Sequence, residues 1–228
     1  MAVKVKILLV EQVTHSVKRF IVEKPSGYRF VPGQATNVSV NQAGLQTKKR
    51  PFTFTSLASD LVLEFIIKGY PTDDYPGHSG VTEVIHRLSA GDELIIDEPW
   101  GTINYDEPGV FIAGGAGITP FLAIFKDLEQ REEIGKNRLI FSNKTQKDII
   151  MEGMLRSLFN RPNQLLLTLT QEKRDGYECG RVDKRFLEEN LKVFNQPFYL
   201  CGSKQMVKDL RTNLVALGAN PKLLVFEK

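Results

Sequence analysis

The first hundred residues of the chain carry short apolar segments, rich in β-branched residues, that are separated by turns. These segments are Val3–Val10, Val17–Val22, Thr36–Val40, Phe52–Thr55, Leu61–Ile67 and Glu93–Ile96. The turns contain glycine or proline and include Pro25-Ser26-Gly27, Val31-Pro32-Gly33, Pro76-Gly77 and Ala90-Gly91-Asp92. Many short strands at this spacing predict a small antiparallel β-barrel. One helix, Thr82–Leu88, is predicted here, because Val81, Ile85 and Leu88 are spaced to share one face.

Beyond this half, short apolar strands alternate with segments of helical period. The predicted strands are Val110–Ala113, Arg138–Phe141, Leu165–Leu169 and Phe198–Leu200. The predicted helices are Pro120–Gln130, Ile150–Phe159, Asp183–Leu191 and Lys204–Leu217. Such alternation predicts a parallel sheet with helices on both faces. The polar segment Gly101–Pro108 marks the predicted boundary, so that residues 1–103 form one domain and residues 104–228 the other.

The composition is that of an ordinary globular protein, with 42% hydrophobic and 25% charged residues among 228. A net charge of +3 is too small to indicate nucleic-acid binding. No apolar run approaches the roughly 18 to 20 residues of a membrane helix, and Ile7–Val10 is too short for a signal peptide. We therefore expect a cytoplasmic protein without membrane or nucleic-acid partners. We also expect a monomer.

Cysteine and histidine are scarce in this chain. Cys179 and Cys201 are the two cysteines, which excludes a disulfide scaffold and an iron–sulfur cluster held by four thiolates of this chain. The three histidines, His15, His78 and His86, lie far apart without metal-ligand spacing. We predict no metal site.

The segment Gly114-Gly115-Ala116-Gly117-Ile118-Thr119-Pro120 follows a predicted strand and opens a predicted helix. Glycine lets the backbone turn tightly and approach a ligand closely. A helix start offers unpaired N–H groups to a pyrophosphate. Pro120 stands where the usual dinucleotide fingerprint has a third glycine. By itself, the segment fits a phosphate loop and a tight strand-to-helix turn equally well.

A second candidate is the strand Arg50-Pro51-Phe52-Thr53-Phe54-Thr55-Ser56. Arginine can pair two oxygens of a diphosphate, and alternation places Phe52 and Phe54 on one face and Thr53 and Thr55 on the other. This arrangement suits a flat ring system that is packed by an aromatic ring and bonded at its edge by a hydroxyl. It also suits an amphipathic strand with a surface arginine. Gly80-Val81-Thr82 opens the predicted helix of this half, either as a second anion-binding helix start or with Thr82 as a simple cap.

Five landmarks in this order resemble the ferredoxin–NADP reductase superfamily, and the resemblance covers nearly the whole chain. They are RPFT at Arg50, GVT at Gly80, the Pro99-Trp100-Gly101 loop, GGAGITPF at Gly114 and YLCGSKQM at Tyr199. The resemblance implies a six-stranded antiparallel FAD barrel followed by a five-stranded parallel nucleotide domain. It also implies FAD as cofactor and NADPH or NADH as hydride donor.

The resemblance implies roles for individual residues by position. Thr53 would face the flavin N5 edge, and Cys201 would border the nicotinamide as a wall, so both are expected at the catalytic centre. The expected flavin contacts are Arg50, Pro51, Phe52, Thr53, Ile66, Ile67, Lys68, Gly80, Val81 and Thr82. The expected nucleotide contacts are Gly115, Ala116, Gly117, Ile118, Thr119, Asn143, Lys144, Cys201, Gly202 and Met206.

The chain departs from the family pattern in three places. Phe52 stands where the family often has tyrosine. Near the end of the chain, Phe226 is the residue able to approximate the aromatic lid that covers the flavin in many relatives. The segment Ser142–Asp148 resembles the Asn-x-Thr pattern of NADH-using reductases, yet its Lys144 and Lys147 could meet a 2′-phosphate. The choice between NADH and NADPH therefore stays open.

The implied activity is hydride transfer from nicotinamide to FAD, followed by electron transfer to an external carrier such as flavodoxin or ferredoxin. The basic run Lys48-Lys49-Arg50 would attract an acidic carrier, or it is an ordinary solvated loop. The alternatives are a flavin reductase, a reductase component of an oxygenase, and a flavin-binding regulatory subunit without hydride transfer. Glu227 is either a late proton relay or a surface tail residue.

Overall fold

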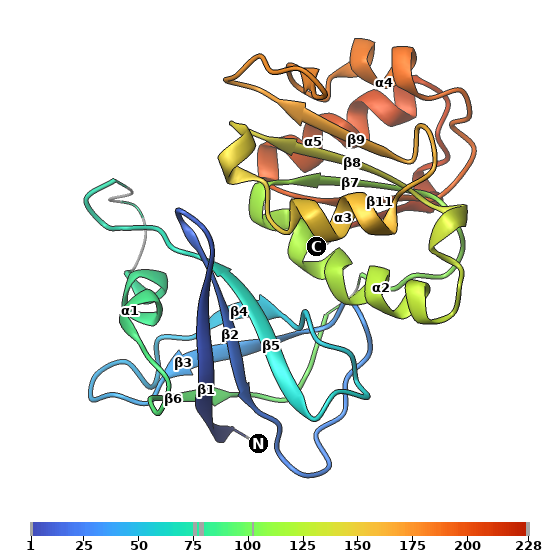
Figure 1. The fold of residues 1–228 in the computed structure, drawn as a ribbon. Coiled ribbons are helices and arrows are strands. Elements are labelled where there is room, and N and C mark those ends of the chain that lie inside the picture. The colour runs from blue at the N-terminus through green and yellow to red at the C-terminus, as the bar shows by residue number, and fades with distance from the viewer. Residues whose placement is uncertain (1, 75–76, 78–79, 102, 227–228) are drawn as a thin grey trace. The chain divides into compact units, whose positions relative to one another are not determined.

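The computed structural model describes residues 2–74, 77, 80–101 and 103–226. The chain forms two compact units, Met1–Gly101 and Thr102–Lys228. The sequence predicted the boundary two residues later, between residues 103 and 104. Each unit has its own sheet (Figure 1). The predicted turn residue Pro76 and the terminal Glu227 lie outside the described residues.

An antiparallel sheet of six strands makes up the first unit (Figure 1). Its strands are β1 (Val3–Thr14), β2 (Val17–Glu23), β3 (Ala35–Val40), β4 (Arg50–Thr53), β5 (Val62–Lys68) and β6 (Glu93–Ile96). They follow the order β4-β3-β6-β1-β2-β5, so β4 and β5 are the edges. Just beyond β4, the amide of Thr55 donates to the carbonyl of Glu64 at 2.9 Å. This bond joins the two edges in the manner of the predicted barrel.

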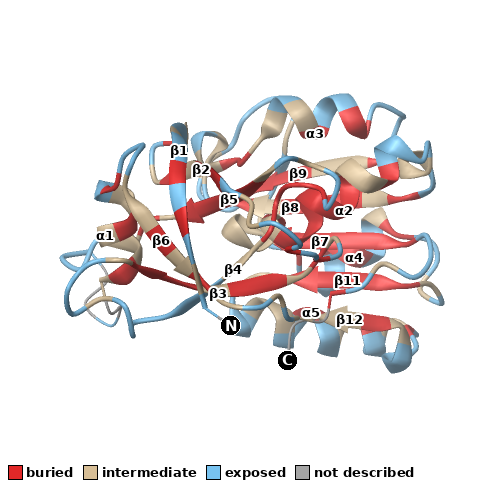
Figure 2. Ribbon diagram, turned by 90° about the horizontal axis from the view of Figure 1, so that it is seen from below, coloured by how far each residue is buried: buried red, intermediate tan, exposed pale blue. Residues whose placement is uncertain are grey.

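Buried apolar side chains of these strands form the core of the first unit. In β1, Val5 and Ile7 are buried while Lys4 and Lys6 are exposed (Figure 2). The ring of Phe54 stacks on Phe30 with 4.2 Å between centroids. Burying an aromatic or aliphatic side chain of this kind stabilises the fold by about 1.5–3 kcal/mol. The strand pattern read from the sequence thus corresponds to one continuous apolar interior.

Two local predictions for this unit are wrong. Helix α1 (Val81–Arg87) begins after Gly80, whose left-handed conformation (φ 73°) starts the helix without a side-chain cap. Thr82 does not cap it, because its hydroxyl instead accepts a hydrogen bond from the amide of Tyr70 at 3.2 Å.

The second wrong prediction is the start of β5. Leu61 was expected to begin this strand, but it is 92% exposed and lies before the strand.

His86, on the last turn of α1, is hydrogen-bonded to the end of β5. Its Nε2 donates to the carbonyl of Ile67 at 2.8 Å, so that nitrogen carries the proton. Nδ1 of His86 lies close to Gly69, and a Cβ added to this glycine would be 2.8 Å from Nδ1. Burial lowers the pKa of His86, the bond to Ile67 partly opposes this, and Lys18 lowers the pKa further.

This environment makes the stability of the protein depend on pH below neutrality. In the unfolded chain a histidine binds its proton near pH 6.5, whereas folded His86 binds it at a lower pH. The unfolded state therefore takes up the proton first, and stability falls as pH drops from about 6.5 towards the folded pKa. We expect His86→Gln, which can still donate to Ile67, to reduce this loss in chemical denaturation from pH 7.5 to 5. An unchanged pH dependence would contradict the role of His86.

The second unit is built on a sheet of six parallel strands (Figure 1). They are β7 (Val110–Gly114), β8 (Arg138–Asn143), β9 (Leu165–Leu169), β10 (Glu178–Cys179), β11 (Phe198–Cys201) and β12 (Leu224–Phe226). Their order is β10-β9-β8-β7-β11-β12. The resemblance implied five strands. The apolar pattern located four of the six strands. It missed β10, which consists of two exposed residues, and β12, which consists of three residues at the end of the described chain.

Helices cover both faces of this sheet (Figure 1). They are α2 (Thr119–Gln130), α3 (Glu152–Leu158), α4 (Lys184–Asn190) and α5 (Lys204–Ala216), with 3₁₀ turns η1 (Gly115–Ile118), η2 (Ile134–Lys136), η3 (Gln146–Asp148) and η4 (Pro221–Leu223). On one face Ile140 packs with Leu187 of α4 and Leu210 of α5. On the other, the ring of Phe111 meets Phe121 of α2 at 5.0 Å. Within the described ranges, no helix is long and apolar enough to cross a membrane.

Candidate functional site

The carboxyl ends of β7, β8, β9 and β11 bring several of the expected nucleotide contacts to one edge of the second unit. β7 ends at Gly114 and β11 at Cys201, and the two strands pair with Cys201 opposite Ala113. β8 ends at Asn143, whose carbonyl accepts a hydrogen bond from the amide of Thr170 at 2.9 Å. In open parallel sheets, ligands bind outside this edge.

The glycine segment forms the single 3₁₀ turn η1 before α2 begins at Thr119. A Cβ on Gly117 would lie 2.4 Å from the carbonyl oxygen of Cys201, so this glycine is required by packing on β11. Gly115 has φ 52°, and a Cβ there would meet nothing within 4 Å. Thr119 donates its hydroxyl to the carbonyl of Ala116 at 3.0 Å and closes the turn. Of these two glycines, Gly115 is the one whose backbone faces open space.

Met206, in the first turn of α5, packs against the other side of the same edge. A Cβ on Gly114 would be 2.3 Å from its sulfur, and one on Gly202 would be 2.9 Å away. The two strand ends therefore need glycine so that the Met206 side chain can lie across them. Met206, an expected nucleotide contact, thus lies against the ends of β7 and β11.

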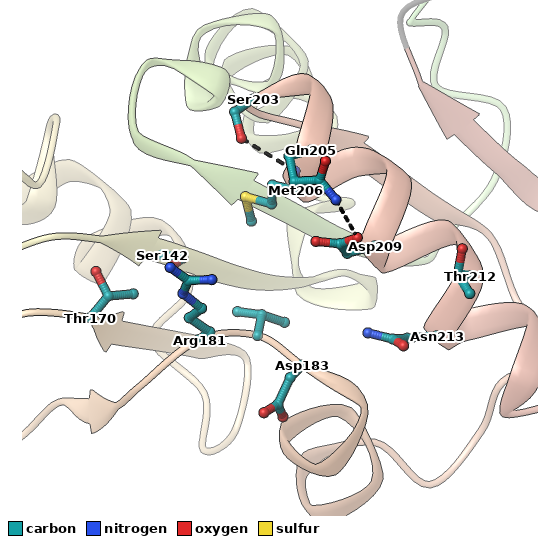
Figure 3. A pocket seen from close by; sticks show the side chains of 11 residues that line it. Ser142, Thr170, Arg181, Asp183, Ser203, Gln205, Met206, Asp209, Thr212 and Asn213 are labelled. Atoms are coloured by element: carbon teal, nitrogen blue, oxygen red, sulfur yellow. Dashed lines mark hydrogen bonds between the residues drawn. The ribbon is translucent and has the colours of Figure 1, made fainter.

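A pocket of about 540 Å³ opens on the α4 and α5 side of this edge (Figure 3). Eleven residues line it, nine of them with polar side chains: Ser142, Thr170, Arg181, Val182, Asp183, Ser203, Gln205, Met206, Asp209, Thr212 and Asn213. Only Met206 among these was expected from the sequence. The others were missed because they lie on four separate segments whose proximity depends on the sheet order.

Arg181 is the cation of this pocket, and Figure 3 shows its side chain extending towards Ser142. It is exposed, and its guanidinium has no hydrogen bond or ion pair with any residue that the structure describes. The two carboxylates of the pocket are engaged locally. Asp183 accepts a hydrogen bond from the amide of Phe186 at 2.9 Å, and Asp209 accepts one from Gln205 at 2.7 Å. The pocket therefore holds one guanidinium without a partner among the described residues and two carboxylates that accept hydrogen bonds from nearby amides.

Asn143 and Lys144, the expected contacts after β8, differ sharply in environment. Asn143 is 4% exposed, and neither polar atom of its side chain has a hydrogen-bond partner among the described residues. Lys144 and Lys147 are exposed and do not line the pocket. The cationic side chain that lines the pocket with Ser142 is Arg181.

Hydrogen bonds join the loops that follow β8 and β9. The carboxylate of Glu152 accepts three hydrogen bonds. They come from the hydroxyl of Tyr177 at 2.5 Å, the guanidinium of Arg156 at 2.8 Å and the side-chain amide of Gln146 at 2.9 Å. Burial alone would raise the pKa of Glu152, but these bonds hold it below its ordinary value. Glu172 accepts from the amide of Gln146 at 2.8 Å. The two loops beside the pocket are therefore fixed by a charged network.

In the first unit, the expected flavin contacts of β4 lie at an exposed edge. Arg50 is exposed and donates from Nη1 to the carbonyl of Lys49 at 2.8 Å, and Pro51 beside it is also exposed. Phe52 is half-buried against the barrel core, and Thr53 is half-buried as well. Lys49 forms an ion pair with Asp97 at 2.7 Å, which weakens the basic run expected to attract an acidic carrier.

The other expected flavin contacts are the end of β5 and the start of α1. Ile66 and Ile67 are buried and Lys68 is half-buried. The bond from His86 to Ile67 ties this strand end to α1, which opens with Gly80, Val81 and Thr82. The structure therefore brings together two backbone segments that are 12 or more residues apart in sequence.

A buried carboxylate next to β4 was not predicted from the sequence. Glu64 is 5% exposed, accepts from the hydroxyl of Thr55 at 2.7 Å and pairs with Arg19 at 2.6 Å. Arg19 also pairs with Glu11 at 2.8 Å. A glutamate in an apolar strand was the available signal, because such a residue is rarely buried without a partner.

Phe226, the expected flavin lid, has a partner within its own unit. It pairs with Leu200 in the sheet, and the guanidinium of Arg211 lies 4.0 Å from the centre of its ring. It also packs on the apolar cluster under α5. Covering a flavin would require this ring to leave these contacts.

The residues present fit the two implied cofactors. In the second unit, the open backbone at Gly115, the unbonded amide of Asn143 and the guanidinium of Arg181 suit a nucleotide with phosphates and sugars. In the first unit, an exposed arginine precedes half-buried Phe52 and Thr53, which suits a flat ring with a diphosphate tail. Within the described ranges, no cluster of three or more metal-ligating side chains occurs.

Comparisons with known proteins agree with this fit. Residues 111–212 match the oxidoreductase NAD-binding domain. NADH–cytochrome b5 reductase 1 of Kluyveromyces lactis is 30% identical over 90% of this chain and 76% of its own length. A Ralstonia reductase component of naphthalene dioxygenase and salicylate hydroxylase systems is 26% identical over 96% of this chain, which spans 66% of that protein.

The fold is shared with a ferredoxin–NADP⁺ reductase from Neisseria gonorrhoeae whose structure contains FAD and NADP. The TM-score is 0.83 at 22% identity, over 99% of this chain and 98% of that one. The expected fold class, enzyme class and cofactors are confirmed. The chain belongs to the ferredoxin–NADP reductase superfamily and is an NAD(P)H-dependent FAD oxidoreductase.

Proposed function

We propose that this protein takes electrons from NADPH through bound FAD and passes them singly to a separate carrier protein. The observation that carries the choice of donor is Arg181, an arginine without a partner among the described residues, in a pocket at the carboxyl edge of the parallel sheet. In dinucleotide sites, a carboxylate receives the ribose 2′-hydroxyl of NADH, whereas an arginine accommodates the 2′-phosphate of NADPH. Here the carboxylates are engaged with the protein and the arginine is not.

In this proposal the second unit binds and orients the nucleotide. The amides of the turn at Gly115 and the N-terminus of α2 receive the diphosphate. Ser142 and Thr170 supply hydroxyls beside Arg181. Asn143 and Lys144 contribute from the end of β8. Cys201, Gly202 and Met206 form the wall that borders the nicotinamide.

The first unit binds the flavin. When bound, FAD accepts a hydride and releases electrons one at a time. Arg50 holds its diphosphate, together with the amides of Gly80, Val81 and Thr82. Phe52 packs against the ring system, the Thr53 hydroxyl bonds its edge, and Pro51 and the backbone of Ile66–Lys68 complete the surroundings.

The electron acceptor is proposed to be a small carrier protein of the flavodoxin or ferredoxin type. This chain has two cysteines and therefore no four-thiolate cluster of its own. The relative from K. lactis is named for cytochrome b5, and that from Ralstonia for an oxygenase system. Residues 1–101 contain 11 basic and 11 acidic residues, so we expect acceptor choice to depend on local contacts more than on long-range attraction. The cytoplasmic location and monomeric state stay predictions.

The test begins with the purified holoenzyme. It should stay yellow after desalting, and NADPH should bleach the flavin faster than NADH does. Steady-state rates with flavodoxin, ferredoxin, cytochrome b5 and free flavin then rank the acceptors. A colourless protein, or a yellow one that neither nucleotide bleaches, would overturn the proposed function. Faster turnover with free flavin than with any carrier would replace it with a flavin reductase.

Arg181→Ala should raise the KM for NADPH by about tenfold while leaving the KM for NADH nearly unchanged. The expected loss follows from removing a charge-assisted bond to the 2′-phosphate, worth about 1.5 kcal/mol or more. Steady-state kinetics with both nucleotides measure it. Lys147→Ala, at an exposed lysine outside the pocket, is the control. Equal effects of R181A on both nucleotides would refute the assignment to the 2′-phosphate.

A further inference from the structure

Asn143 ends β8 with a buried carboxamide that the fold leaves without a hydrogen bond. The side chain is 4% exposed, and within the described part of the chain neither Oδ1 nor Nδ2 has a partner. Buried polar side chains in native proteins nearly always have partners, because losing water without replacement costs free energy. An exception of this kind needs an explanation.

Asn137, at the other end of the same strand, shows what this fold does with a structural amide. It is 1% exposed, and its Oδ1 accepts from the amide of Gly109 at 3.1 Å. Its Nδ2 donates to the hydroxyl of Tyr105 at 3.2 Å and to the carbonyl of Glu133 at 3.3 Å. The two asparagines are comparably buried, so burial alone does not explain the unbonded state of Asn143.

The position of Asn143 points to the nucleotide. Ser142 lines the pocket on the α5 side, so alternation along β8 turns Asn143 to the face covered by α2. In the sheet register Ser142 pairs with Gly114, after which the chain enters the η1 turn. Asn143 thus lies at the carboxyl edge, beside the strand end from which the glycine turn departs.

We propose that the Asn143 carboxamide is a ligand of a ribose hydroxyl group of the nicotinamide nucleotide, an inference that rests on the proposed nucleotide site. A carboxamide with both atoms unbonded needs an acceptor for Nδ2 and a donor for Oδ1. Phosphate oxygens only accept at neutral pH, and they would leave Oδ1 unmatched. The neighbouring hydroxyls of a ribose both donate and accept, and they match both atoms.

Burial of this amide adds a conformational consequence. A sugar can reach Oδ1 and Nδ2 only if the surrounding side chains or backbone give way. Nucleotide binding at Asn143 is therefore coupled to a local rearrangement at the end of β8. The nucleotide-free protein carries the cost of the unbonded amide, and binding removes it.

This coupling predicts opposite effects on stability and on binding. Leucine has nearly the shape of asparagine and no polar atoms, so N143L removes the unbonded amide from the nucleotide-free protein. We expect its FAD-loaded form to melt about 3 °C higher than the unaltered holoenzyme. Its Kd for NADP⁺ and for NAD⁺ should rise by about tenfold, because both carry the same riboses. Scanning calorimetry and isothermal titration calorimetry measure the two quantities.

The matched control is Asn137→Leu, which should lower the melting temperature and leave the Kd for NADP⁺ unchanged. Asn143→Val provides a second variant if N143L fails to fold. A fall in melting temperature for both Asn143 variants would make Asn143 structural and overturn the proposal. An unchanged Kd with a raised melting temperature would mean that the amide holds only buried water, and would also overturn it.

These outcomes are distinct from a failure of the proposed function. Unaltered holoenzyme that binds neither NADP⁺ nor NAD⁺ would contradict the nucleotide site itself. Normal binding by the unaltered protein together with normal binding by N143L would contradict the role of Asn143 alone. R181A separates the two ligands further, since it should weaken NADP⁺ only, whereas N143L should weaken both.

Discussion

Replacing Gly117 with alanine is expected to slow reduction of the bound flavin by NADPH by about 100-fold or more. A Cβ at this position would lie 2.4 Å from the carbonyl oxygen and 2.6 Å from the carbonyl carbon of Cys201. Cys201 is the last residue of β11, which pairs with β7 on one side and β12 on the other, so its backbone cannot move aside. The η1 turn must move instead, and misplacement by about 1 Å at a binding site costs on the order of 10²-fold in rate.

Stopped-flow absorbance of the FAD-loaded variant measures this effect. The flavin content should stay normal, because the proposed flavin contacts belong to the other unit. Gly153→Ala in α3 is the matched control, since a Cβ there would meet nothing within 4 Å and alanine favours helix. Reduction of G117A at the unaltered rate would show that the close packing on Cys201 does not position the turn.

Replacing Arg50 with alanine is expected to raise the Kd for FAD by about 100-fold or more. Hydrogen bonds to a charged group contribute about 1.5–3 kcal/mol each, and an arginine can make two of them to a diphosphate. Arg50→Lys keeps the charge but loses the paired geometry. Its Kd for FAD should therefore lie between that of the unaltered protein and that of R50A. Flavin content after desalting and fluorescence titration of the apoprotein with FAD measure the series.

Arg29→Ala provides the control for Arg50, because Arg29 is an exposed arginine of the same unit with no proposed contact to the flavin. It should leave the Kd for FAD unchanged. Equal flavin loss in R29A and R50A would indicate a general electrostatic effect. Full retention of FAD by R50A would remove Arg50 from the diphosphate site and leave the α1 amides as its main contacts.

The apolar pattern was sufficient for most of the fold. The short apolar segments Glu93–Ile96 and Leu165–Leu169 became β6 and β9 with the predicted bounds. The apolar pattern gave wrong predictions where a strand forms without burying its side chains, or where an apolar side chain is exposed. β10 consists of two exposed residues that form a strand only because β9 lies beside them. Leu61 is apolar yet 92% exposed, so its side chain gave a false signal of a buried strand.

The candidate site was predictable only where one continuous segment carries it. The motifs at Arg50 and Gly114 could be read directly, since each contact follows its neighbour in the chain. Arg181 and Thr170 could not be read this way. They share a pocket because β8, β9 and α5 converge at one edge, and a linear sequence does not specify which loops meet.

By itself, the sequence determined that the chain has a strand-rich half and an alternating half, and that a glycine turn opens a helix in the second. These features follow from local periodicity and from the conformational freedom of glycine, which act over a few residues. Only the tertiary structure decided why Gly117 must be glycine and which cation serves the pocket. It also decided that Asn143 is buried without a bond. Each of these depends on contacts between residues far apart in sequence, such as Gly117 with Cys201, which exist only once the sheet has formed.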